Sequence, residues 1–359
     1  MKKLSYVFMV WVLAFVANIP SVAQPANGRP QPAPELRPTQ SNDIWAQTLT
    51  GSQYSELWNY QVYLDNGMSL HITFSATNFG KLKSAVTGIR VSMYGLDNKV
   101  YHLNREYPAS DFRQDKNEYK FDLNPRQNNI WFKGKLPDFH EIYINTEKGG
   151  HRFKINLQFS DIVRGYTLGD GIFELEGSEV GMVTHIPYAR VTGYAGVNDN
   201  VKDVKGVASM DHTWQNQNAV KHFTGGYKFV HQRDRNNWDI VTFMEPKGGN
   251  GKATGYRLMS ESGRVSVQRI DRSIHEKHHS EKKVKAPALL AAHTNEGILK
   301  LGTTETPDVS SVIADQGWLA RQVIRGIIGG EIKDYRGAAT LTLPNGTVKK
   351  GHFTYFAVE

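Results

Sequence analysis

One short segment of the sequence combines an acid, an imidazole and an indole, Met210-Asp211-His212-Thr213-Trp214. An acid beside an imidazole can take part in proton transfer, so Asp211 and His212 are candidate functional residues. In a regular strand, Met210, His212 and Trp214 share one face and Asp211 lies on the other. Asp211 and His212 could then serve one site only at a bulge or a seam. The alternative is that Asp211 is structural, bonded to a backbone amide or an arginine.

A second candidate set lies near the start of the chain. Glu56, Trp58 and Tyr60 alternate along one predicted strand, so their side chains share a face. That face can line a ligand cavity, and aromatic residues can equally fill a core. With His212 and Trp214 they make up the candidate ligand-binding residues.

A histidine-rich stretch offers the strongest suggestion of a metal site. His275, His278 and His279 lie within the basic segment Arg264–Lys285. Neighbouring lysines disfavour cation binding, so we expect a solvated loop there, with contact to an anionic membrane surface as the alternative. We expect no metal and no cofactor.

The elements that must position these residues are strands. Trp58–Leu64 and Met68–Ser75 flank Asn66-Gly67, whose tolerance of positive φ favours a tight hairpin. Apolar and polar residues alternate again over Phe153–Phe159, as expected of half-buried antiparallel strands. Helical spacing favours only one helix, over Asp308–Ile328. The sequence therefore predicts an all-β fold with little helix.

A weak internal sequence repeat, which we call the internal echo, predicts two related β units. Aligning Gly206 with Gly351 places Met210 opposite Tyr355, and no charged residue stands opposite Asp211. Closed or nearly closed barrels would hide the edges of so many antiparallel strands.

Three segments resemble one protein family. Gly206–Trp214 resembles the Gly-x-x-x-x-Asp-His-x-Trp signature of the lipocalin-like hydroxyneurosporene-synthase group, which includes carotenoid 1,2-hydratases, AttH-type proteins and some fungal Diels–Alderases. Ser55–Tyr60 and Ile186–Gly193 resemble two earlier motifs of that group, in the same order. Asn59 departs from the pattern, because the group usually has an aromatic residue there.

The resemblance implies two tandem lipocalin-like (calycin-type) antiparallel β-barrels, with a ligand in a barrel or at their junction. It also implies that Asp211 could protonate a carbon–carbon double bond, as an acid of this region is thought to do in the hydratases. We therefore predict a protein that binds a hydrophobic small molecule of lipid or isoprenoid type. The alternative is a hydratase- or cyclase-type enzyme acting on a polyene, with Asp211 as general acid.

Composition sets the remaining expectations. Residues 1–23 resemble a signal peptide cleaved before Gln24, which predicts export to the periplasm or the outside of the cell. The sequence has no cysteine, which excludes thiolate catalysis and Cys-ligated metal. The net charge of +8, without a dense basic and aromatic array, argues against nucleic acid.

We expect a monomer with four parts. These are the signal peptide, a proline-rich leader over residues 24–43 that is expected to be a tether or disordered, and barrels over residues 44–215 and 216–359.

Overall fold

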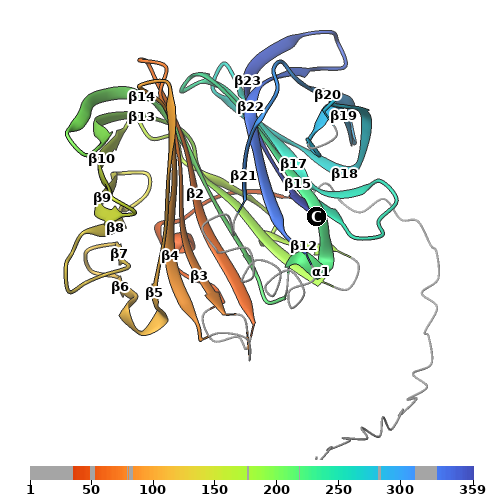
Figure 1. Ribbon diagram of the computed structural model, residues 1–359. Coiled ribbons are helices and arrows are strands. Elements are labelled where there is room, and N and C mark those ends of the chain that lie inside the picture. The colour runs from red at the N-terminus through yellow and green to blue at the C-terminus, as the bar shows by residue number, and fades with distance from the viewer. Residues whose placement is uncertain are drawn as a thin grey trace, which may run out of the picture. The chain divides into compact units, whose positions relative to one another are not determined.

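The computed structural model describes residues 35–48, 53–78, 80, 84–175, 178–217, 219–281, 284–311 and 330–359. The predicted signal peptide lies outside the described residues. No helix within these ranges is long and apolar enough to cross a membrane. Two antiparallel sheets carry almost all of the described chain, so the predicted all-β class is confirmed (Figure 1).

The first sheet has fourteen strands and curls around one apolar core. Its main path runs β5-β4-β3-β2-β14-β13-β10-β9-β8-β7-β6, and β1, β11 and β12 attach at its side. The strands are β1 (Leu36–Pro38), β2 (Tyr54–Leu64), β3 (Ser69–Asn78), β4 (Val86–Leu96), β5 (Lys99–Pro108), β6 (Arg113–Asp115), β7 (Lys120–Asp122), β8 (Ile130–Lys133), β9 (His140–Lys148), β10 (His151–Ser160), β11 (Tyr166–Leu168), β12 (Ile172–Leu175), β13 (Ser178–Val197) and β14 (Asn200–Gln215).

The second sheet closes on itself as an eight-stranded barrel, because β20 pairs with β22 as well as with β19. A ninth strand, β21, pairs with residues 333–336 of β22. The strands are β15 (Phe223–Asp234), β16 (Asn237–Pro246), β17 (Lys252–Glu261), β18 (Arg264–His278), β19 (Pro287–Thr294), β20 (Gly297–Thr303), β21 (Asp308–Ser311), β22 (Ile332–Thr342) and β23 (Val348–Val358).

Helix is confined to short turns among the described residues: η1 (Ser41–Ile44), η3 (Ala109–Asp111) and α1 (Ala219–His222). The predicted helix over Asp308–Ile328 is wrong at its start, where Asp308–Ser311 is strand β21, and residues 312–328 lie outside the described residues. The edge of β22 captures this segment through main-chain pairing, which overrides weak helical spacing.

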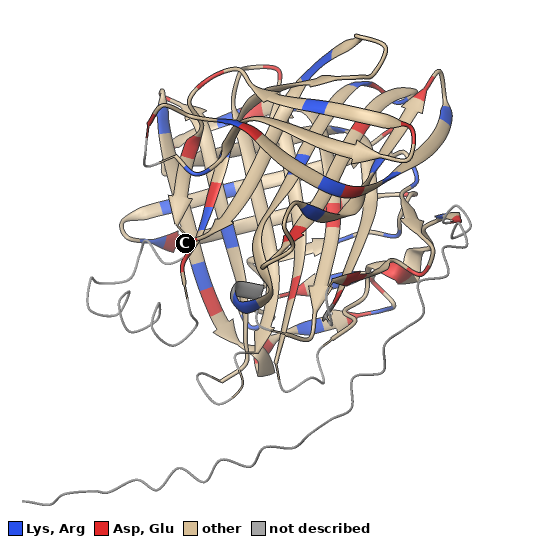
Figure 2. Cartoon of the chain, turned by 90° about the vertical axis from the view of Figure 1, so that its right-hand side faces the viewer, with Lys and Arg blue, Asp and Glu red and all other residues tan. Residues whose placement is uncertain are grey.

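Two further expectations need correction. The basic segment Arg264–Lys285 is not a loop over most of its length, because Arg264–His278 forms β18, paired on both sides. Figure 2 shows basic and acidic residues interspersed along the strands on this side of the molecule. The leader is likewise not a free tether throughout, since Leu36–Pro38 pairs with β11 and Leu36 packs against apolar residues.

The internal echo has a structural counterpart. In both sheets the last strand pairs with the earliest strand of the main path, β14 with β2 and β23 with β15. Met210 and Tyr355, which the alignment matched, are both buried. The first sheet ends at Gln215 and the second begins at Phe223, but residues from Pro34 onward form one compact unit. A domain boundary at Gln215 stays a prediction.

Candidate functional site

The Asp211-His212 pair is split between two faces, as its alternation predicts. Strand β14 lies between β13 and β2, where it places Met210 and His212 inside the first sheet and Asp211 outside. The neighbouring strand β13 carries an irregularity at His185, which turns that side chain inward beside His212. The bulge therefore adds a second histidine to the interior and leaves Asp211 outside it.

On the inner face, His212 is held by a carboxylate and by aromatic rings. Its Nε2 lies 2.7 Å from Glu56 Oε1. The Trp58 ring stacks on it at 4.8 Å, and Trp214 packs at 4.8 Å in a tilted arrangement. Trp214 can lie so close because its neighbour on β13 is Gly181, where an added Cβ would stand 1.9 Å from the indole.

Glu56 has a structural role: its carboxylate holds neighbouring segments together through hydrogen bonds. We call this arrangement the clasp. Its two oxygens also accept hydrogen bonds from the backbone amides of Gln47 and Thr48, at 2.7 and 3.1 Å, and from the Thr48 hydroxyl at 2.9 Å. This carboxylate therefore ties the segment before β2 to the interior of the first sheet. With every acceptor direction in use, it has little capacity left for a ligand.

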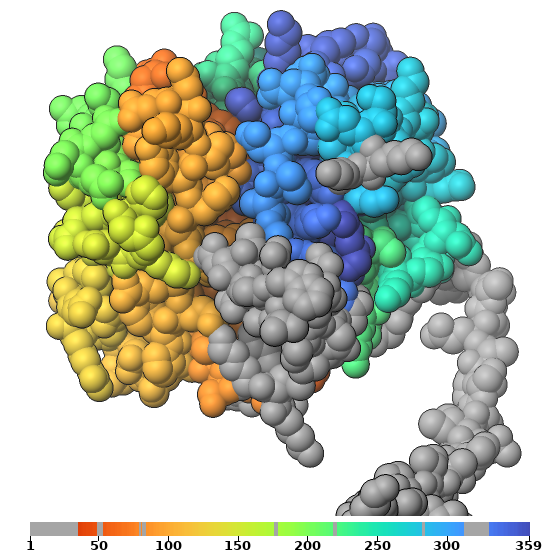
Figure 3. Space-filling view, viewed as in Figure 1, coloured from red at the N-terminus to blue at the C-terminus, as the bar shows by residue number. Residues whose placement is uncertain are grey.

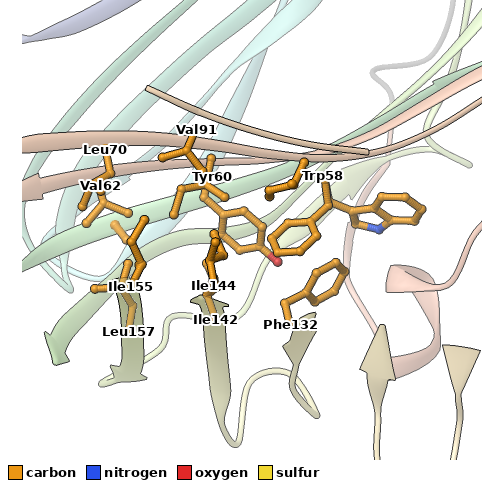
Figure 4. Packing of buried hydrophobic residues seen from close by; sticks show 14 of the residues in the cluster. Trp58, Tyr60, Val62, Leu70, Val91, Phe132, Ile142, Ile144, Ile155 and Leu157 are labelled. Carbon is orange, nitrogen blue, oxygen red and sulfur yellow. The ribbon is translucent and has the colours of Figure 1, made fainter. Parts of the chain in front are cut away.

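The interior around these residues is filled. Glu56 and His212 have no accessible surface, and Trp58 and Tyr60 are 1% exposed, so these side chains border no water-sized space. Figure 4 shows Trp58, Tyr60 and Phe132 packed against one another in this core. The predicted ligand-binding role of these residues stays a prediction, and this packing gives it no room.

Burial sets the charge state of two inner histidines. It lowers the pKa of His140, which hydrogen-bonds the Tyr60 hydroxyl at 2.9 Å, to about 3. It also lowers the pKa of His185 well below the usual value, with a smaller contribution from His212. Both imidazoles are therefore neutral near pH 7.

On the outer face, Asp211 joins the two sheets. It forms an ion pair with Lys228 on β15 of the second sheet. Asn59 donates to its other oxygen at 3.1 Å and accepts from Thr73 at 3.0 Å. Asn59, the residue that departs from the family pattern, is thus part of this joint. A carboxylate paired with an ammonium group differs from one desolvated among aromatic rings, and the catalytic role of Asp211 stays a prediction.

Half of the surface between the sheets is apolar. A cluster of buried residues there comes from β11, β12 and β13 of the first sheet and from β15, β16 and β17 of the second. Met182, Trp238, Tyr256 and Leu258 are among its most buried members. This half packs like a domain core and holds the two sheets in one unit.

The other half is polar, and we call it the junction. The first sheet presents two neighbouring rows of outward side chains across β14, β2, β3 and β4. The second sheet presents rows across β15, β23 and β22. One row of the first sheet consists of Asp211, Asn59, Thr73 and Arg90, and the neighbouring row consists of Ser209, Gln61, His71 and Ser92. The main facing row of the second sheet consists of Lys228, Thr354 and Arg336.

Within the junction, five side chains form a cluster that we call the junction cluster: Tyr63, His71, Tyr94, Arg336 and His352. Tyr63 stacks on His352 of the other sheet at 3.9 Å and meets His71 edge-on at 6.1 Å. Arg336 donates to the Tyr94 hydroxyl at 3.2 Å, and its guanidinium lies 5.8 Å from that ring. In the space-filling view the strands in orange and in blue meet along the junction (Figure 3).

Several buried polar atoms of the junction have no partner. They are Gln61 Oε1, Tyr63 Oη, Ser209 Oγ and Arg336 Nε. Buried polar groups in folded proteins nearly always have a hydrogen-bond partner. A group of unpaired buried atoms therefore indicates a bound water or ligand.

Charged side chains also lie close together near Arg336. Asp334 pairs with Arg90 and lies 3.9 Å from Arg336, so two guanidinium groups share one carboxylate. Burial, followed by the charges of Arg336 and Lys228, lowers the pKa of His71 well below its usual value. Burial also raises the pKa of Tyr63, which keeps its hydroxyl proton.

The alternation of apolar and polar residues along β3 and β4 marks the outward-facing members of the junction cluster, but it does not show that they lie between two sheets. His71 and Tyr94 occupy the polar positions of strands whose other positions form the core. A polar face is ordinarily the solvent face of an antiparallel sheet. Here the second sheet covers it, and only the three-dimensional arrangement shows that.

The histidine-rich stretch contributes to a separate cluster. His275, predicted to lie in a loop, is on β18 and contacts Glu245 at 2.9 Å. Ser273 and Tyr355 donate to the same carboxylate, at 2.7 and 3.1 Å. Within the described ranges, no group of three or more His, Cys, Asp or Glu side chains is arranged to hold a metal ion.

Comparison with known proteins supports the fold. No family model and no curated protein sequence matches the chain. Among solved structures, an AttH-like protein from Nitrosomonas europaea matches with a TM-score of 0.61 and 13% identity, over 92% of this chain and 98% of that one. CghA in complex with Sch210972 matches at 0.59 and 12% identity, over 91% and 99%.

Kievitone hydratase from Nectria haematococca matches with a TM-score of 0.51 and 12% identity, over 91% of this chain and 97% of that one. The predicted resemblance to the lipocalin-like group is thereby confirmed at the level of the fold. At such identities the likeness shows the fold alone.

Proposed function

We propose that the protein binds an amphipathic small molecule of lipid or isoprenoid type at the junction, with its polar end directed to Arg336 and Tyr63. The observation that carries this proposal is the group of unpaired buried polar atoms, contributed by both sheets. The Tyr63, Tyr94 and His352 rings supply apolar contact surface around them. The interiors of the two sheets offer less room for a ligand, because large aromatic side chains such as Trp58, Tyr60 and Phe229 are fully buried there.

The fold comparisons are in keeping with this proposal. CghA has this fold and was solved with the small molecule Sch210972, and kievitone hydratase is named for a reaction on one. The predicted export and monomeric state belong to the same proposal. The predicted export implies a mature protein that begins at Gln24 and acts outside the cytoplasm.

Removing the Arg336 charge is expected to weaken binding of an amphiphile with an acidic head. Retinoic acid and retinol are matched probes, because they share a polyene chain and differ in the head group. In calorimetric titrations, Arg336→Gln should weaken retinoic acid binding about 10- to 100-fold, as expected for one lost hydrogen bond to a charged group. Binding of retinol should change much less.

Arg269→Gln is the control, because Arg269 is exposed on β18 away from the junction. Equal weakening by both arginine substitutions would reject a specific role for Arg336. Unchanged retinoic acid affinity in Arg336→Gln would reject the junction as the binding site.

A second candidate function is a hydratase- or cyclase-type enzyme with Asp211 as general acid. One observation favours it: Asp211 faces the same junction as the proposed ligand. The ion pair with Lys228 favours a joint instead, because it occupies a carboxylate oxygen that a general acid would have to present to its substrate.

Substituting Asp211 separates the two roles. We expect Asp211→Asn to lower the free energy of unfolding by about 1–3 kcal/mol, since the partly buried Lys228 ammonium loses its partner, and to leave ligand binding intact. In urea unfolding, the double variant Asp211→Asn/Lys228→Met should lose less than the sum of the single variants. Full stability of Asp211→Asn, with loss of turnover on a polyene substrate, would establish the acid role and contradict the joint.

A further inference from the structure

A row of aromatic and amide side chains crosses the outer face of the first sheet, away from the residues of the junction. Trp131, Tyr143, Asn156 and Tyr194 are cross-strand neighbours on β8, β9, β10 and β13. All four are partly exposed. At about 4.8 Å between adjacent strands, the row spans about 14 Å, the scale of a short linear ligand.

The rings and amides in this row are pre-arranged. Trp131 and Tyr143 stack with their centroids 5.3 Å apart. Asn145, two residues along β9, donates to the Tyr143 hydroxyl at 3.4 Å. Trp131 Nε1 and Asn156 Oδ1 are buried within this face and have no partner. The base of the row therefore contains one donor and one acceptor that the protein itself does not satisfy, beneath partly exposed rings.

A polar pocket of about 370 Å³ adjoins the row through Asn145. Gln127, Asn129 and Asn145 supply amides to its wall, and Arg105 and Arg152 supply guanidinium groups. The volume lies at the lower end of the range for small-molecule sites, about 300–1,000 Å³. Amides cross-link the wall, since Asn129 donates to the Asn145 carbonyl at 3.0 Å.

The charges around this face are locally paired. Lys120 pairs with Asp122 at 2.9 Å and Lys133 with Glu141 at 3.2 Å, on either side of Trp131. In the pocket, Arg152 pairs with Glu147 at 3.0 Å. Arg105, which also lines the pocket, donates to the Thr146 hydroxyl and the Glu147 carbonyl instead of a carboxylate. Because the other cations are paired, the face fits a ligand rich in hydroxyl groups better than a polyanion.

We propose that this face binds a neutral oligosaccharide. A sugar ring has apolar C–H surface that packs on aromatic rings, and neighbouring hydroxyls that both donate to and accept from side-chain amides. The row would hold successive sugar units, and the pocket would hold one end of the chain. This site is independent of the small-molecule site at the junction.

Affinity electrophoresis of the full chain in gels containing one soluble polysaccharide each tests this proposal. Mixed-linkage glucan, xylan and galactomannan are the neutral probes, and hyaluronan is the anionic one. We expect retardation by at least one neutral polysaccharide, and Asn145→Ala should weaken that interaction at least tenfold.

Gln158→Ala is the matched control, because this exposed amide lies two residues from Asn156 on the same strand and outside the pocket. It should leave retardation unchanged. Absence of retardation by all three neutral polysaccharides would overturn the proposal, as would retardation by hyaluronan alone or equal retardation of wild type and Asn145→Ala. Circular dichroism melting of each variant separates loss of binding from loss of folding.

Discussion

Lowering the pH from 7 to 5 is expected to reduce the free energy of unfolding by about 6 kcal/mol, roughly 2 kcal/mol for each of three buried histidines. These are His71, His140 and His185, whose folded-state pKa values burial lowers, to about 3 for His140. The unfolded chain binds a proton at each imidazole below about pH 6.5, and the folded chain does not. Their stabilising effect is therefore complete above pH 6.5 and is lost as the pH falls toward the folded-state values.

Urea unfolding at several pH values measures this effect. Between pH 7 and 5 the histidines titrate, whereas carboxyl groups titrate mainly below this range. Burial raises the pKa of Glu245, but the hydrogen bonds from His275, Ser273 and Tyr355 outweigh it and leave this pKa below its usual value of 4.5, so that group contributes only at lower pH. His185→Gln should remove about one third of the loss, whereas His151→Gln, at an exposed position on β10, should remove none. A pH-independent free energy of unfolding over this window would contradict the buried, neutral state of these imidazoles.

The second large effect is expected from Glu56→Ala, which should lower the free energy of unfolding by about 3–5 kcal/mol. The substitution leaves the buried His212 ring and the buried Thr48 amide without their acceptor, and it removes the bond to the Gln47 amide nearer the surface. Glu56→Gln should cost less, because it keeps one acceptor oxygen in place.

Glu174→Ala on β12 is the matched control, since that side chain is exposed and should change stability by less than about 0.5 kcal/mol. Unfolding is measured in urea by intrinsic fluorescence. If Glu56→Ala were as stable as Glu174→Ala and instead lost ligand binding, Glu56 would be a ligand-binding residue, as the sequence first indicated, and the clasp would be wrong.

Much of the fold follows from the sequence because its causes are local. Period-two alternation specifies which residues of β2, β3 and β10 face a core, and Asn66-Gly67 specifies one hairpin. The opposite faces of Asp211 and His212 follow from the same alternation. The strand β18 escapes this reasoning, because its charged residues face outward on a strand that barrel closure holds in place.

The candidate site was predictable only in part, for a related reason. Alternation along β3 and β4 puts His71, Thr73 and Tyr94 at polar positions but cannot say what covers that face. Arg336 and His352 reach it from strands more than 240 residues away. Contacts between two sheets depend on how the sheets pack, and no local period records that.

The most direct test of a ligand between the two sheets is native mass spectrometry of the mature protein purified from its own host. The account predicts a co-purified small molecule on the wild type, released on denaturation. Arg336→Gln should lose most of it, and Arg269→Gln should retain it. A wild-type protein that carries no small molecule, or one retained equally by both variants, would contradict a binding site at the junction.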